Sequence, residues 1–85
     1  MSEAVSRPRR LFGHNLRRLR TRAGLSQVAL GELTGVKPAR ISEYESGLYA
    51  PTIDMLERFA DAFDVPIAAL FDETDFDEKP KRKKR

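Results

Sequence analysis

Apolar residues recur every three or four positions in successive stretches of this chain, the spacing that predicts helices with one buried face. No stretch shows the alternation of apolar and polar residues that is typical of a half-buried strand. We therefore expect an all-α fold of five helices. The first helix begins near residues 8–11 and ends at Gly24, the second begins after Ser26, the third spans 38–46, the fourth begins after Thr52, and the fifth spans 66–71.

Several of the expected helix ends carry residues that suit them. Ser26 and Thr52 can each accept a hydrogen bond from a free backbone N–H of the helix that follows. Lys37 occupies the cap position of the third helix and lacks such an acceptor, but Pro38 fits the first helical position because its φ is already helical. Gly13 lowers the intrinsic helix propensity of the first helix.

Residues 27–44 place two short helical stretches on either side of a glycine. Gly31 is small enough to let the two helices approach, and Gly35 tolerates the positive φ of a tight turn. Ile41 and Tyr44 then follow on the side of the second stretch that we expect to be buried. This order of small, turn and apolar residues is typical of a helix-turn-helix, whose second helix enters the major groove of DNA.

Residues at many positions, both within residues 27–44 and outside them, match the sequence pattern of one known family. They are Arg20, Gly24, Leu25, Ser26, Gln27, Thr34, Gly35, Val36, Ile41, Ser42, Glu45, Gly47, Pro51, Leu56, Ala60, Val65, Leu70 and Phe71. Over residues 11–71 the chain resembles the phage-repressor/Cro-like helix-turn-helix family, also called the xenobiotic-response-element family. The resemblance implies a compact five-helix, lambda-repressor-like domain with its helix-turn-helix at helices two and three, which binds double-stranded DNA as a dimer on a pseudo-palindromic site.

The resemblance also implies roles for three polar residues. In the family, the residues that match Arg20 and Glu45 often form a partly buried ion pair, which would hold the angle between two helices. Two independent surface charges are the alternative. Gln27 begins the second helix, where free N–H groups and the helix dipole favour an anion, and the matching glutamine of the family clamps a DNA phosphate.

The face of the third helix opposite Ile41 and Tyr44 is expected to meet DNA, because residues three and four apart share a face. Lysine can donate to guanine acceptors, glutamate can accept from a cytosine amine, and small apolar residues can touch thymine methyl groups. The expected base contacts are Lys37, Pro38, Ala39 and Glu43, and the expected phosphate contacts are Gln27, Arg40, Ser42, Ser46 and Tyr49. A base is the alternative for Arg40, and packing against the fourth helix is the alternative for Tyr49.

A second copy of the chain is the expected protein partner. A domain of this size reads only a few base pairs, so two copies on two half-sites are needed for useful specificity. We expect the fifth helix and the end of the fourth to supply a contact about a two-fold axis. The candidates for this contact are Ile67, Ala68 and Phe71.

Length and composition restrict the class of protein. Eighty-five residues allow one domain, and 40% hydrophobic residues support a small core. No apolar run is long enough to cross a bilayer and residues 1–10 lack a signal sequence, so we expect a soluble cytosolic protein. The resemblance implies that the cytosol is bacterial and that the protein is associated with the nucleoid. The chain has no cysteine and a single histidine, His14, so we expect no disulfide, no metal or other cofactor, and no catalytic pair of an enzyme.

Charge is distributed unevenly along the chain. Residues 1–22 carry seven arginines and one glutamate, and residues 23–40 carry Lys37, Arg40 and Glu32, so both segments are net basic. Residues 41–78 carry eleven acidic residues and one arginine, and residues 79–85 carry six basic residues. A basic part that includes the helix-turn-helix suits DNA phosphates, while the acidic part would face away. The alternative is that these charges simply solvate a small domain.

We therefore divide the chain into three segments. Residues 1–10 are expected to form a flexible basic arm that reaches phosphates or a minor groove, and residues 11–71 the DNA-binding domain. Residues 72–85 are expected to form an acidic linker and a basic tail without fixed structure. The tail would contact DNA, fold back on the linker or bind a protein partner.

The function that these features predict is sequence-specific transcriptional regulation, most simply repression. The alternatives are the antitoxin of a toxin–antitoxin pair and the controller protein of a restriction–modification system. A toxin-binding segment would need apolar anchors after Phe71, and only Phe76 lies there, which weighs against the antitoxin.

Overall fold

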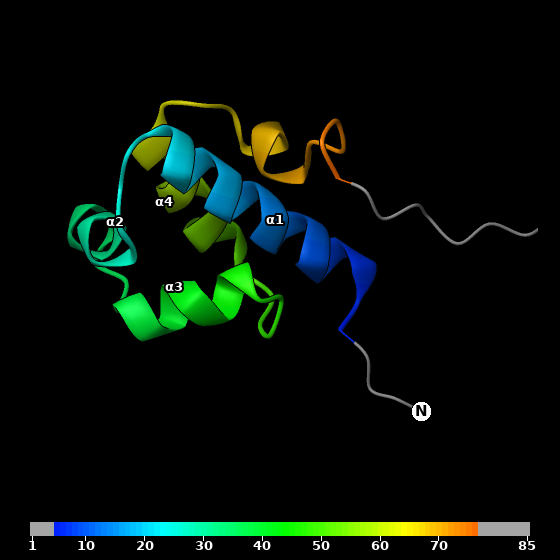
Figure 1. Ribbon diagram of the computed structural model, residues 1–85, viewed down its shortest axis with the longest axis horizontal. Coiled ribbons are helices and arrows are strands. Elements are labelled where there is room, and N and C mark those ends of the chain that lie inside the picture. The colour runs from blue at the N-terminus through cyan, green and yellow to red at the C-terminus, as the bar shows by residue number, and fades with distance from the viewer. Residues whose placement is uncertain (1–4, 77–85) are drawn as a thin grey trace, which may run out of the picture.

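The computed structural model describes residues 5–76, and these residues form helices without any strand. The helices are α1 (Arg7–Arg22), α2 (Gln27–Thr34), α3 (Pro38–Glu45), α4 (Ile53–Phe63) and a final 3₁₀ helix, η1 (Ile67–Phe71) (Figure 1). The all-α class is confirmed. The predicted count of five helices is not confirmed. The described residues form four α-helices, and residues 67–71 form a short 3₁₀ helix after them.

Helix α1 begins earlier than the sequence pattern indicates. The Ser6 side chain accepts a hydrogen bond from the backbone N–H of Arg9 at 3.3 Å, and Pro8 lies in the first turn, where its missing N–H costs nothing. Residues 7–10 are therefore helical, and the expected flexible arm is wrong for them. The expected arm's residues 1–4 lie outside the described range.

The turn between α2 and α3 has the expected chemistry. Gly35 ends α2 in the left-handed region with φ 77°, and its N–H donates to the Gly31 carbonyl at 2.7 Å. Thr34 is buried, but its hydroxyl donates to the Leu30 carbonyl at 2.8 Å and accepts from the Val36 N–H at 3.4 Å. The hydroxyl is therefore satisfied, and the less apolar residue is tolerated at this position.

Phe12 lies at the centre of the core, fully buried on α1. Its ring meets Tyr44 of α3 edge-on at 5.8 Å between centroids, and it lies 6.1 Å from both Phe59 and Phe71. The buried apolar cluster comprises Phe12, Leu16, Leu30, Val36, Ile41, Tyr44, Leu56, Phe59, Ala60 and Leu70. All five helices contribute to it, so the position of α3 depends on the whole fold.

Helices α1 and α3 approach each other closely at Gly13. A β-carbon at Gly13 would lie 2.5 Å from the Tyr44 carbonyl oxygen and 2.6 Å from that of Glu45. Only glycine fits this backbone contact, so Gly13 sets the distance between α1 and α3.

Residues 72–76 return along α1, where they were expected to be an unstructured linker. The buried Asn15 amide donates to the Asp72 carbonyl at 2.8 Å, and Arg7 forms a 3.1 Å ion pair with Glu73. Phe76 then packs against His14 with 5.3 Å between ring centroids. Side-chain and backbone hydrogen bonds from Thr74 lower the pKa of Asp72. The linker prediction is therefore wrong for residues 72–76, while the rest of the predicted linker and tail, residues 77–85, lies outside the described residues.

Candidate nucleic-acid interface

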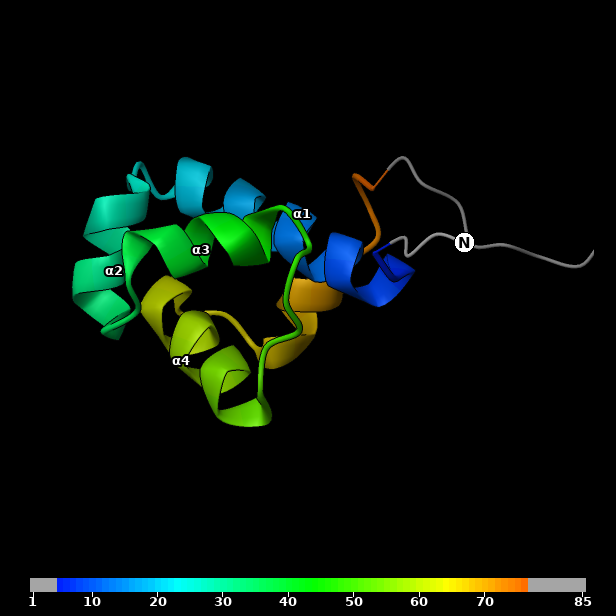
Figure 2. The ribbon, with the colours of Figure 1, turned by 90° about the horizontal axis from the view of Figure 1, so that it is seen from below.

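Helix α3 presents its outer face at the edge of the molecule. It forms the lower edge in Figure 1 and lies on the near side, beside α2, in the perpendicular view of Figure 2. Ile41 and Tyr44 are buried against the core, at 0% and 7% exposure. The exposed residues at its beginning include Lys37, Pro38 and Ala39, three of the four expected base contacts. The start of α3 is thus open to a large partner.

Lys37 precedes α3 in an extended conformation, and its side chain makes no capping hydrogen bond to the helix. Its ammonium group is therefore not used in holding the helix end. Lys37 and Pro38 also line a cleft of about 330 Å³ with Val28 of α2, which is 56% exposed. Val28 was not among the expected contacts, although its position directly after Gln27 in the first turn of α2 could have indicated it.

Three of the expected contacts form one cluster beside α3. The Arg40 guanidinium carbon lies 4.3 Å from the centroid of the Tyr49 ring, and Arg40 Nε lies 3.6 Å from Glu43 Oε1. The stacked ring and the carboxylate restrict the arginine without burying it. Tyr49 is thus positioned by Arg40, whereas the sequence offered only DNA or the fourth helix as its partner.

Ser42 and Ser46 lie on the exposed side of α3, the first within the helix and the second at its C-cap. The Ser46 hydroxyl donates to the Glu43 carbonyl at 3.0 Å, which helps to end the helix. The Ser42 side chain makes no hydrogen bond with any residue of the described range, so its hydroxyl is available to a partner.

Arg20 and Glu45 form a two-bond ion pair between α1 and α3. Arg20 Nε donates to Glu45 Oε2 at 2.6 Å and Nη2 donates to Oε1 at 3.1 Å, while Nη1 donates to the Leu25 carbonyl at 2.9 Å. The two side chains are only 12% and 7% exposed. The hydrogen bond to Glu45 raises the pKa of Arg20 above its ordinary value. Pair geometry of this kind restrains the angle between two helices.

Gln27 joins the same network from α2. Its amide nitrogen donates to Glu45 Oε1 at 3.1 Å, so α1, α2 and α3 are linked through one carboxylate. Gln27 also lines an open cleft of about 270 Å³, together with Arg17, Arg20, Ser42, Glu45 and Ser46. The first residue of α2 and the outer side of α3 therefore border one concave surface, which is rich in hydrogen-bond donors.

The residues expected to form a dimer contact lie on η1, which follows α4 and is not part of the helix-turn-helix. Ile67 and Phe71 are 38% and 36% exposed, and Ala68 is exposed as well. Phe71 also packs on Phe12, so one side of its ring belongs to the core.

Within residues 5–76, no group of three or more His, Cys, Asp and Glu side chains is arranged to hold a metal ion. In the same range, no helix has the length and apolar content needed to cross a membrane.

Comparison with known proteins gives a consistent result. Residues 11–73 match the family described as helix-turn-helix domain. The cryptic phage CTXphi transcriptional repressor RstR of Vibrio cholerae is 35% identical over 77 residues, which span 88% of this chain and 69% of the repressor.

Two solved structures are also similar. The restriction-modification controller protein C.AhdI from Aeromonas hydrophila is 33% identical with a TM-score of 0.71, over 74% of this chain and 96% of the controller. An HTH_3 family transcriptional regulator from Vibrio cholerae is likewise 33% identical with a TM-score of 0.71, over 75% of this chain but only 36% of that regulator.

Proposed function

The chain belongs to the helix-turn-helix domain family, and we propose that it represses transcription as a homodimer bound to a pseudo-palindromic DNA operator. As a member of this family, of the phage-repressor/Cro-like type, it is a DNA-binding transcriptional regulator and not an enzyme. The observation that carries the repressor role is the similarity to a phage repressor over most of both chains. We place it in the bacterial cytosol, on the nucleoid.

The exposed beginning of α3 is the part that reads bases in this proposal. Lys37 donates to guanine, Pro38 and Ala39 touch thymine methyl groups, and Glu43 accepts from a cytosine amine. Glu43 lies near Arg40, so a base that binds Glu43 also meets the stacked guanidinium. This arrangement favours a G·C pair at that position.

The surrounding polar groups act as phosphate contacts. Gln27 stands at the start of α2, and Ser46 and Tyr49 follow the end of α3, so the two ends of the helix-turn-helix hold the two sides of a groove. The ion pair of Arg20 and Glu45 supports this surface from behind. The support is architectural, because both side chains are largely buried.

The dimer contact is assigned to η1. Ile67, Ala68 and Phe71 offer apolar surface that is exposed in one copy. A two-fold axis through this patch would set two α3 helices about one helical turn of DNA apart, near 34 Å.

A restriction-modification controller is the second candidate function. It is favoured by the similarity to C.AhdI, because the match covers 96% of the C.AhdI chain. An antitoxin is less well supported, because Phe76, the apolar residue available for a toxin, packs on His14 and lies 5.2 Å beneath the Arg7 guanidinium.

The repressor role can be tested in two steps. Purified protein is first used to select sites from a randomised duplex library, and the selected site is then placed over a promoter that drives a reporter. Expression of the protein should lower reporter output, and a scrambled site should abolish the effect. Raised or unchanged output from the intact site would contradict repression.

A further inference from the structure

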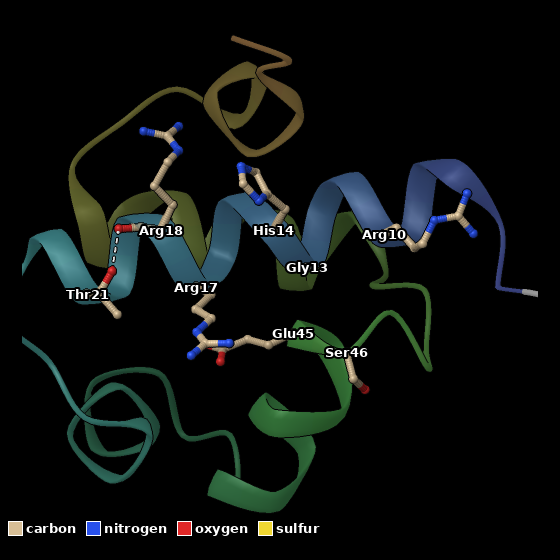
Figure 3. Close-up of a pocket in the computed structure, with 8 residues that line it drawn as sticks. All are labelled: Arg10, Gly13, His14, Arg17, Arg18, Thr21, Glu45 and Ser46. Carbon is tan, nitrogen blue, oxygen red and sulfur yellow. Dashed lines mark hydrogen bonds between the residues drawn. The ribbon is translucent and has the colours of Figure 1, made fainter. Parts of the chain in front are cut away.

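A second concave surface follows α1 on the side where α1 meets the end of α3 (Figure 3). This α1 groove has a volume of about 490 Å³ and is lined by Arg10, Gly13, His14, Arg17, Arg18, Thr21, Glu45 and Ser46. Gly13 lies at the floor of the groove, where α1 contacts the backbone of α3. Arg17 extends from α1 toward Glu45 in the close-up, while His14 and Arg18 point to the opposite side of the helix.

The α1 groove is positively charged. Arg10, Arg17 and Arg18 line it, although Arg18 points to the other side of α1, and the charge of its one carboxylate, Glu45, is already opposed by Arg20 at 2.6 Å. Arg18 is held by Asn15 and lies 3.9 Å from Asp72, and Arg10 donates to the Val5 carbonyl. Arg17 differs from both, because it is exposed and makes no hydrogen bond or ion pair with any residue of the described range. It is the cation of the groove that is available to a ligand.

The α1 groove adjoins the cleft beside Gln27. Both are lined by Arg17, Glu45 and Ser46. The two concave surfaces therefore meet at these residues, one reaching the beginning of α2 and the other the first half of α1. A DNA duplex carries one negative charge for about every 1.7 Å of its axis, so a strand that crosses the first cleft presents further phosphates to the second.

We propose that the α1 groove binds the DNA phosphate backbone that flanks the bases read by α3, with Arg17 as its principal contact. The proposal rests on the DNA-binding function proposed above and extends it to a surface outside the helix-turn-helix. It adds affinity but no base preference, because phosphates carry no sequence information. Charge complementarity identifies the occupant, since a duplex backbone is a continuous polyanion and Arg17, which has no ion-pair partner in the described range, lies where the two concave surfaces meet.

The test compares Arg17→Gln with Arg22→Gln, which removes the same charge from an exposed residue of α1 that lines neither concave surface. Affinity for a mixed-sequence duplex of about three helical turns is measured over a range of salt concentrations. One lost phosphate contact should reduce the slope of log affinity against log salt by about 0.9. Arg17→Gln should show this smaller slope, and Arg22→Gln should keep the wild-type slope. Arg17→Lys keeps the positive charge, so its slope should be close to that of the wild type.

Ethylation interference gives an independent result on a site selected from a library. Wild-type protein should show a sensitive phosphate outside the contacted bases in each half-site, and Arg17→Gln should lose that signal alone. If Arg17→Gln keeps the wild-type slope and interference pattern while Gln27→Ala weakens binding, the α1 groove proposal is wrong and the proposed function stands. If the wild-type protein binds no duplex, both are wrong.

Discussion

Replacing Gly13 with alanine would test how closely α1 must approach α3. At a solvent-exposed position of a helix, replacing glycine with alanine stabilises a protein by about 1 kcal/mol, because alanine has the higher helix propensity. In this fold the new methyl group would lie 2.5 Å and 2.6 Å from two backbone carbonyl oxygens of α3. These oxygens cannot rotate away as a side chain can, so the two helices must separate.

The magnitude follows from these two opposing terms. Overpacking a well-packed site costs about 1–3 kcal/mol, and a clash with backbone on two sides belongs at the upper end of that range. After the gain in propensity is subtracted, we expect Gly13→Ala to lower the free energy of unfolding by about 1–2 kcal/mol. DNA affinity should fall as well, because α3 would shift relative to the phosphate contacts on α1 and α2.

Urea unfolding followed by circular dichroism measures this change. Arg22→Ala, at an exposed position of the same helix, is the control for an alanine substitution that makes no contact with α3. A Gly13→Ala protein as stable as wild type, or more stable, would refute the argument that backbone contact requires glycine here.

Two further predictions concern the ion pair and the dimer. Glu45→Ala should lower the free energy of unfolding by about 3–5 kcal/mol, because it leaves Arg20 partly buried without its partner. The double variant Arg20→Leu with Glu45→Leu should recover part of that loss in the same unfolding assay, and no recovery would argue against a coupled pair. Ile67→Asp should shift the protein from dimer to monomer in equilibrium ultracentrifugation over a dilution series, with Glu57→Gln as a surface control. An unchanged dimer, or a wild-type protein that is monomeric both free and on DNA, would contradict the η1 contact.

Local signals in the sequence predict much of this fold. Ser26 and Thr52 accept the expected hydrogen bonds from Ala29 and Met55, so the starts of α2 and α4 follow from the cap residues alone. The turn at Gly35 is equally local, because its φ is set by the tight connection. The exposed face of α3 follows from the spacing of its buried residues.

Features that depend on distant parts of the chain were not predicted. Asn15 is fully buried and bonds Asp72, 57 residues away, so the return of residues 72–76 cannot be read from their acidic composition. Gly13 was interpreted as a weak helix residue, although its role is a contact with α3. Arg17 was missed for the same reason, because only the packed helices bring it beside Ser46.

The most direct test of the account is whether α3 selects DNA sequence while α2 holds phosphate. Wild-type protein, Lys37→Ala and Gln27→Ala are each used to select from the same randomised duplex library. The wild-type protein should select a two-fold symmetric site. Lys37→Ala should lose its base preference at one position in each half-site, at a cost of about 1–3 kcal/mol. Gln27→Ala should select the wild-type site with uniformly weaker affinity. Selection of no site by the wild-type protein, or an unchanged preference in Lys37→Ala, would contradict the account.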